Sequence, residues 1–215
     1  MNKDNKAFEA ELGQMSERIA AISQERPSHK EVLAFLKDVV IEQFKIKADI
    51  EIHPVSVDED LVRKKSAEGF PLVDRGDLEL DTASAAALFK ALCKVLKQNV
   101  KVHKEVEKIE EVVSRGEVNL EELFKKTAEH GAEHVAALSE KLNVKGGILF
   151  FLAENSLRPI FEAYADALKG RVDQERWWRA YCPICGSKPV MAELVGQERK
   201  RFLIPCSLLR MAPEV

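Results

Sequence analysis

The chain has 215 residues, 46% of them hydrophobic and 32% charged, which is enough for one sizeable domain or for one domain with a small module attached. Its formal net charge of -3 provides no general attraction to nucleic acid. Its amino-terminal segment lacks the apolar core of a secretory signal, and its longest nearly apolar run, residues 146–153, is too short to span a bilayer, so we expect a cytoplasmic protein.

Apolar residues recur three and four positions apart over residues 7–23 and 32–44, which predicts two amphipathic helices that pack against later parts of the chain. Pro27 separates these helices. Ser28 and Glu31 have the pattern of a capping box at the start of the second one.

The helical period disappears between residues 46 and 81, a segment interrupted by prolines and glycines. We expect a short helix at residues 58–67 and loop elsewhere. The apolar segment Gly69-Phe70-Pro71-Leu72 is expected to be held against the core by packing, because long connections often lie draped over a core.

A third long helix is predicted to begin after Asp81 or Thr82, and its apolar stripe extends as far as Val113. A fourth helix is predicted over residues 120–142, with Asn119 as its cap.

Residues 145–169 are apolar nearly all round, which is typical of a helix in the middle of a bundle. Pro159 lies inside this pattern and removes one backbone donor. We therefore predict a kink, or a break into two helices, near Leu157.

The strongest chemical signal follows this helix. The segment Cys182-Pro183-Ile184-Cys185-Gly186 places two thiols in one tight turn, where they can bind the same tetrahedral metal ion. Four cysteines in a reducing compartment favour metal binding over a disulfide framework, and a thiol–disulfide redox pair is the alternative. Cys206 follows at a spacing typical of zinc ribbons, so Cys182, Cys185 and Cys206 are the predicted metal ligands. Both zinc and iron suit thiolate ligands.

The predicted site has no evident fourth ligand, because Leu209 stands where the second cysteine of another pair would lie. Water, a histidine from elsewhere or another chain could complete it. Residues 188–195 and 199–204 have the pattern of a β-hairpin, and a hairpin with a cysteine pair is typical of a zinc ribbon or rubredoxin-like module. The predicted fold is mainly α, with a helical domain over 1–170 and an incomplete module of this kind over 171–215.

Two alternative functions come from other motifs. His130 and His134, with Glu133, match the inverted zincin order, so a small metal-dependent enzyme is one alternative, although surface or groove-lining histidines are the favoured explanation because short motifs often match by chance. The basic run 199–201 in the hairpin gives the second, a nucleic-acid-binding zinc ribbon. Cys93, alone on a helical stripe, is predicted to be a small core residue.

Several motifs occur together: Gly69-Phe-Pro-Leu, Leu157-Arg-Pro-Ile-Phe-Glu-Ala, Cys182-Pro-Ile-Cys185-Gly-Ser-Lys-Pro189-Val, Arg201-Phe-Leu-Ile and Cys206-Ser-Leu. In this combination the chain resembles the formate dehydrogenase accessory protein (FdhE) family, loosely over its whole length and specifically from Leu157 onward. The resemblance implies a cytoplasmic protein that is not an enzyme and that binds the molybdenum- or tungsten-containing catalytic subunit of formate dehydrogenase before export or assembly.

The resemblance also implies a helical domain followed by a rubredoxin-like module whose Cys-x-x-Cys pairs hold iron or zinc. The chain departs from the family pattern at Leu209, and the further cysteine pairs of the family do not follow. We therefore expect a truncated or frameshifted reading frame. Because a bound metal often supplies much of the folding free energy of such a module, we also expect the residues after Gly170 to be less stable than the helical part.

Overall fold

The computed structural model describes residues 3–204 except residues 48, 57, 99–100, 173–176, 178, 190 and 196–199, and it describes residues 3–9, residue 11 and both strands by their backbone alone. The helices are α1 (Lys3–Glu25), α2 (Lys30–Lys47), α3 (Glu59–Glu68), α4 (Thr82–Lys97), α5 (His103–Ser114), α6 (Leu120–His130), α7 (Ala132–Leu142) and α8 (Gly146–Leu168). Short 3-10 turns lie at Pro27–His29, Arg75–Asp77 and Lys169–Arg171. The predicted mainly helical class is confirmed.

Two strands follow the helices. β1 (Met191–Val195) and β2 (Lys200–Ile204) pair antiparallel, with Met191 opposite Ile204. The described residues do not by themselves amount to a zinc-ribbon or rubredoxin-like module, so that part of the predicted fold stays a prediction. None of the described helices is long and apolar enough to cross a membrane.

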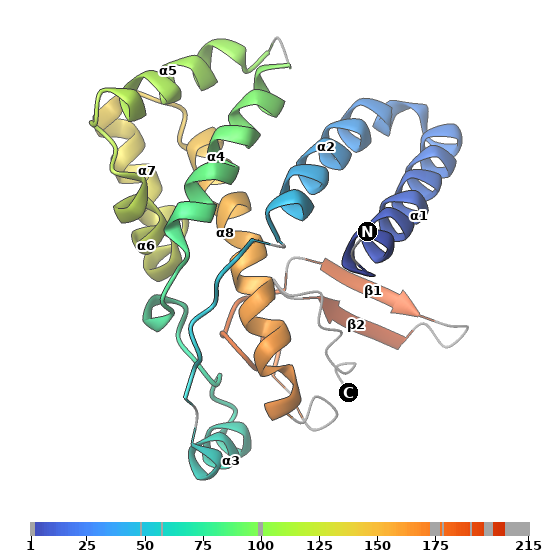
Figure 1. The fold of residues 1–215 in the computed structure, drawn as a ribbon, viewed down its shortest axis with the longest axis vertical. Helices are drawn as coiled ribbons and strands as arrows, with labels where there is room; N and C mark the ends of the chain where they lie inside the picture. Colours follow the sequence, from blue (N-terminus) through green and yellow to red (C-terminus); the bar gives the residue numbers. More distant parts are fainter. Residues whose placement is uncertain are drawn as a thin grey trace.

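Helix α8 lies at the centre of the bundle, with α4, α6 and α7 on one side and α2 on the other (Figure 1). Its side chains Leu149, Leu152 and Leu157 are 0% exposed. Full burial of one such side chain contributes about 1.5–3 kcal/mol. The central apolar helix predicted from the sequence is thus present, and it is the element around which the core forms.

Helix α8 continues through Pro159, so of the kink or break predicted near Leu157 the break into two helices is wrong, and the kink stays a prediction. A proline at this position cannot donate a hydrogen bond to the carbonyl of Asn155, four residues earlier. Gln43 of α2, which is buried, donates from Nε2 to that carbonyl oxygen at 2.9 Å. A contact between two helices therefore replaces the bond that is missing inside α8.

Two predicted long helices are each divided in the structure. The stripe predicted to run on to Val113 is split, because α4 ends at Lys97 and α5 begins at His103, whose Nδ1 lies 2.7 Å from the Lys97 carbonyl oxygen. The helix predicted over 120–142 is split at Gly131, whose φ of 60° and ψ of -135° are accessible essentially to glycine alone.

The predicted helix caps are confirmed at two places and wrong at one. Asp81 Oδ1 accepts from the Ser84 N–H at 2.9 Å, and Asn119 Oδ1 accepts from the Glu122 N–H at 3.2 Å. Ser28 instead lies within the Pro27–His29 turn, with its hydroxyl 3.4 Å from His29 Nδ1, so it forms no capping box.

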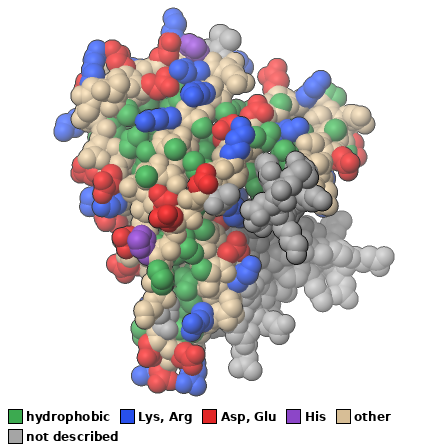
Figure 2. Space-filling model, viewed as in Figure 1, with side chains coloured by type: hydrophobic (Ala, Val, Ile, Leu, Met, Phe, Trp, Pro, Cys, Tyr) green, Lys and Arg blue, Asp and Glu red, His purple; other side chains and the backbone are tan. Residues whose placement is uncertain are grey.

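The helical hairpin of α1 and α2 is only partly covered. Helix α2 packs against α4 and α8, while α1 packs against α2. Val39 is buried, but Val32 and Leu36 on the predicted stripe of α2 are exposed. Charged side chains of both signs are interspersed over the face of the helical part drawn in Figure 2.

Candidate functional site

Cys182 and Cys185 lie at the two ends of one tight turn. The Gly186 N–H donates to the Cys182 carbonyl at 2.9 Å, and the Cys182 N–H donates to the Ser187 carbonyl at 2.8 Å. Gly186 has a φ of 69°, in the left-handed region that favours glycine. The Cys185 Sγ lies 3.0 Å from the Ser187 hydroxyl. The predicted turn is therefore present, and we call residues 181–187 the knuckle.

The knuckle is held by the loop that follows α3, residues 69–73, which we call the 69–73 loop. The Leu72 N–H donates to the Pro183 carbonyl at 3.0 Å, and the Val73 N–H donates to the Ile184 carbonyl at 2.9 Å. The expectation that packing holds this segment is confirmed for Leu72, which is buried, and is wrong for Phe70, which is exposed. The loop is also held by backbone hydrogen bonds to the knuckle, and the sequence did not predict these bonds.

Side chains extend this contact on either side. The Tyr181 hydroxyl donates to the Gly69 carbonyl, and Trp177 packs edge-on against the Tyr181 ring with its indole N–H bound to the Tyr181 carbonyl at 2.7 Å. Pro71 lies so close to Gly186 that a Cβ at Gly186 would be 3.2 Å from Pro71 Cγ. A glycine at position 186 therefore suits both the left-handed backbone conformation and the close packing of Pro71 against this residue.

The knuckle is buried on its inner side. Cys182 and Ile184 are 0% and 1% exposed and form a small apolar cluster with Ala165 and Leu168, at the end of α8. Residues before and after Gly170 therefore share buried contacts. The division of the chain into two domains at this position stays a prediction.

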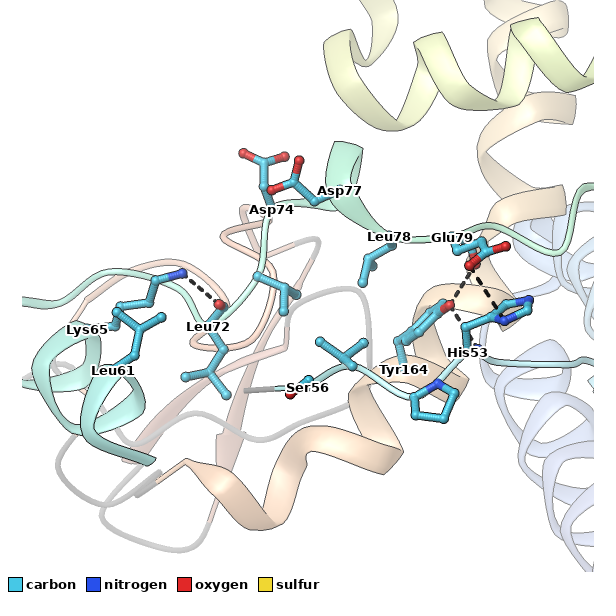
Figure 3. Close-up of a pocket in the computed structure, with 13 residues that line it drawn as sticks. His53, Ser56, Leu61, Lys65, Leu72, Asp74, Asp77, Leu78, Glu79 and Tyr164 are labelled. Carbon is cyan, nitrogen blue, oxygen red and sulfur yellow. Dashed lines mark hydrogen bonds and ion pairs between the residues drawn. The ribbon is translucent and has the colours of Figure 1, made fainter. Parts of the chain in front are cut away.

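A groove of ≈ 340 Å³ lies beside the 69–73 loop (Figure 3). Leu72 and Val73 form part of its wall, and Lys65 Nζ donates to the Leu72 carbonyl at 2.8 Å. The other lining residues are His53, Pro54, Val55, Ser56, Leu61, Asp74, Asp77, Leu78, Glu79 and Tyr164. Leu72 and Val73 thus contribute both to the wall of the groove and to the support of the knuckle.

The far end of the groove is fixed by Tyr164 of α8, which is 2% exposed. Its hydroxyl donates to the Glu79 carbonyl at 2.6 Å and accepts from the His53 N–H at 3.2 Å, so one buried group joins two loop segments (Figure 3). His53 Nδ1 also lies 3.5 Å from Glu79 Oε2.

Within the part of the chain that the structure describes, no group of three or more Cys, His, Asp or Glu side chains is placed to hold a metal ion. Cys206 and Leu209 lie outside the described residues. Two thiols on one turn fit half of a tetrahedral thiolate site. The full ligand set Cys182, Cys185 and Cys206, and the choice between iron and zinc, stay predictions.

The predicted placement of His130 and His134 on one face of one helix is wrong. Helix α6 ends at His130, and His134 belongs to α7, beyond the turn at Gly131. His130 Nε2 lies 3.4 Å from Glu129 Oε2, whereas His134 lines a different pocket with Glu122 and Lys141. The helical geometry on which the metal-dependent enzyme alternative depends is therefore absent at these residues.

Of the two remaining sequence predictions, the structure tests the one for Cys93 and not the one for the basic run 199–201. Cys93 is 1% exposed, and burial together with the negative charge of Glu110 raises the pKa of its thiol to about 12, so it is a protonated core residue as predicted. In the basic run of the hairpin, Arg199 lies outside the described residues, and Lys200 and Arg201 are described by their backbone alone.

Sequence reasoning missed Tyr181, Tyr164 and Gln43. Tyr181 directly precedes Cys182, and that adjacency is the one local signal that could have drawn attention to it. The other two act through contacts with residues that are 85 to 112 positions away, for which a single sequence contains no spacing signal.

No family model matches the chain. The chain is 23% identical over 181 residues to the protein named "Protein FdhE homolog" of Aquifex aeolicus, a match that covers 84% of this chain and 58% of that protein. It thus spans less than two thirds of the length of this relative. The crystal structure of the FdhE protein from Pseudomonas aeruginosa has a similar fold, with a TM-score of 0.52 and 16% identity over 95% of this chain and 66% of that one. Together, the sequence match and the shared fold confirm the resemblance of this chain to the FdhE family.

Proposed function

We propose that the protein is an accessory factor for the assembly of formate dehydrogenase and that it acts in the cytoplasm by binding the catalytic subunit of that enzyme, not by catalysing a reaction. The observation that carries this proposal is the contact between the 69–73 loop and the knuckle. Both segments belong to the motifs of the FdhE resemblance, they are far apart in the sequence, and they are joined by two backbone hydrogen bonds. Two of the motifs thus meet in one site, which we propose as the binding site for the partner.

Phe70 is the side chain of this site that we assign first to the partner. It is 56% exposed, although Gly69 and Leu72 beside it are buried and hydrogen-bonded to the rest of the molecule. A large aromatic side chain that is presented on a fixed backbone is a frequent anchor of protein interfaces.

Cys182 and Cys185, together with Cys206, are proposed to hold iron or zinc in a rubredoxin-like arrangement. A thiolate-bound metal would make this part of the protein sensitive to the redox state, because oxidised thiols no longer bind it. The module would then report or adjust redox state while the catalytic subunit is being assembled.

A pull-down with the formate dehydrogenase catalytic subunit tests this proposal. We expect the full chain to retain the subunit, and we expect Cys182→Ala, Cys185→Ala and Phe70→Ala to weaken retention, the last by about fivefold or more if Phe70 is an interface anchor. Leu36→Ala is the matched control, because Leu36 is similarly exposed but lies on α2.

The result that contradicts the proposal is a full chain that does not retain the subunit under any condition of metal loading. The double variant His130→Ala/His134→Ala addresses the enzyme alternative. We expect it to bind the subunit and the metal like the unmodified chain, and loss of metal content in this variant would favour the metalloenzyme instead.

A further inference from the structure

Leu72 and Val73 each contribute to two features, the contact with the knuckle and the wall of the groove. Their backbone N–H groups donate to the Pro183 and Ile184 carbonyls of the knuckle, and both residues line the groove beside it. A displacement of these two residues would therefore alter the knuckle contact and the groove wall together.

The two acceptors occupy a particular position in the knuckle. Pro183 and Ile184 are the residues that lie between Cys182 and Cys185. A metal ion bound by both thiols would close the ends of this short segment, and each thiol would release its proton to solvent on binding. The carbonyl groups that hold the 69–73 loop would then be fixed in space.

We propose that metal binding at Cys182 and Cys185 fixes the 69–73 loop and thereby shapes the groove, so that the knuckle is a metal-dependent conformational switch. This inference rests on the metal site of the proposed function and goes beyond it by naming the residues that transmit the state of the site. Without the metal, the segment between the thiols gains conformational freedom, the hydrogen bonds of Leu72 and Val73 open more often, and the groove loses an ordered wall.

The remaining contacts explain why the effect stays local. Lys65 Nζ donates to the Leu72 carbonyl, which ties the loop to α3, and Arg179 Nη2 donates to the Glu68 carbonyl at 3.2 Å, which ties the segment before the knuckle to the end of the same helix. Apolar contact between the knuckle and the bundle is confined to one end of α8, where Cys182 and Ile184 pack with Ala165 and Leu168. The coupling is therefore expected at the 69–73 loop and near the end of α8, and not at Leu92 in α4.

Residue-resolved hydrogen exchange by NMR tests the switch on the full chain, first stripped of metal by a chelator and then loaded with Zn²⁺ alone. We expect Zn²⁺ to slow exchange of the Leu72 and Val73 amides by about tenfold or more and to leave that of Leu92 in α4 unchanged. The double variant Cys182→Ser/Cys185→Ser should show no effect of Zn²⁺. If Zn²⁺ binds the unmodified chain while the two amides exchange as before, or if no Zn²⁺ binds, the switch is wrong.

Reciprocity gives a second test, because a loop that is fixed by the metal must in turn strengthen metal binding. Tyr181→Phe removes the hydroxyl that binds the Gly69 carbonyl and leaves both thiols intact. We expect the affinity for Zn²⁺ to fall about fivefold. An unchanged affinity would overturn the coupling. Neither measurement involves formate dehydrogenase, so its outcome is independent of the pull-down.

Discussion

The core around α8 and the contact between the knuckle and the 69–73 loop are held together by different forces. In the core, fully buried apolar side chains such as Leu149 and Leu152 close the space between helices. At the knuckle, a small apolar cluster is supplemented by backbone hydrogen bonds between residues 72–73 and residues 183–184. The first kind of contact supplies most of the folding free energy, whereas the second depends on backbone geometry and can open locally.

The largest effect is expected from removing volume in the core. Leu152 is 0% exposed in the middle of α8, and Leu152→Ala should lower the free energy of unfolding by about 2–5 kcal/mol, because it loses buried apolar surface and leaves a cavity. Urea denaturation followed by circular dichroism measures this. Leu36→Ala on the exposed part of α2 is the control, with an expected change within about 0.5 kcal/mol. Equal effects would contradict the central place of α8.

A smaller but more specific effect is expected at the polar contact inside the core. Gln43→Leu preserves volume but leaves the Asn155 carbonyl without the donor that Pro159 cannot provide. We expect a loss of about 1–3 kcal/mol in the free energy of unfolding. Gln24→Leu, at an exposed position of α1, is the matched control.

The same contact can be tested by restoring the missing donor. Pro159→Ala supplies an N–H group four residues after Asn155, so in the Gln43→Leu background it should recover part of the lost stability. A double-mutant cycle measures the coupling between the two positions. Strictly additive effects would show that Gln43 does not substitute for the backbone bond of α8.

Apolar periodicity predicted the elements that line the core, because burial of one helix face leaves a direct trace in the spacing of residues. It predicted the helix at 145–169 for this reason. It did not predict the turn at Gly131, since a glycine inside a periodic stretch is compatible with a continuous helix. The interpretation of His130 and His134 was wrong because a spacing of four indicates one face only where the helix is unbroken.

The candidate site was predictable in part for a related reason. The pattern Cys182-Pro-Ile-Cys185-Gly186 specifies a tight turn through residue types with distinct chemistry. The loop that holds this turn does so mainly with the N–H groups of Leu72 and Val73, and every residue other than proline carries such a group. A contact of this kind leaves little trace in side-chain identity, and it becomes visible only in three dimensions.

At the knuckle we expect an effect that is confined to the neighbourhood of the substitution. Gly186→Ala places a Cβ on a residue with a φ of 69° and 3.2 Å from Pro71 Cγ, which should cost about 1–2 kcal/mol. Hydrogen exchange of the Leu72 and Val73 amides should become faster, while the urea midpoint of the bundle stays unchanged. Gly170→Ala is the control, because a Cβ there meets no atom within 4 Å. A global loss of stability in Gly186→Ala would mean that the two regions unfold as one.

The smallest effect is expected at Asp81, which joins the bundle to the segment that leads to the groove. Its carboxylate accepts from the Ser84 N–H in the first turn of α4 and from the Glu51 N–H in that segment. Burial alone would raise the pKa of Asp81, but the hydrogen bonds from Ser84 and Glu51 outweigh it, and the pKa is lowered from 3.8.

The ionised form of Asp81 therefore stabilises the folded protein above the pKa of the unfolded chain, and this contribution disappears as the pH falls through the lower pKa of the folded state. Asp81→Asn keeps a capping oxygen but cannot ionise, so the unmodified chain should exceed it in stability by less than about 1 kcal/mol at neutral pH, and the difference should shrink below about pH 4. A difference that is independent of pH, measured by urea denaturation across this range, would show that the charge of Asp81 does not contribute to joining the groove segment to the bundle.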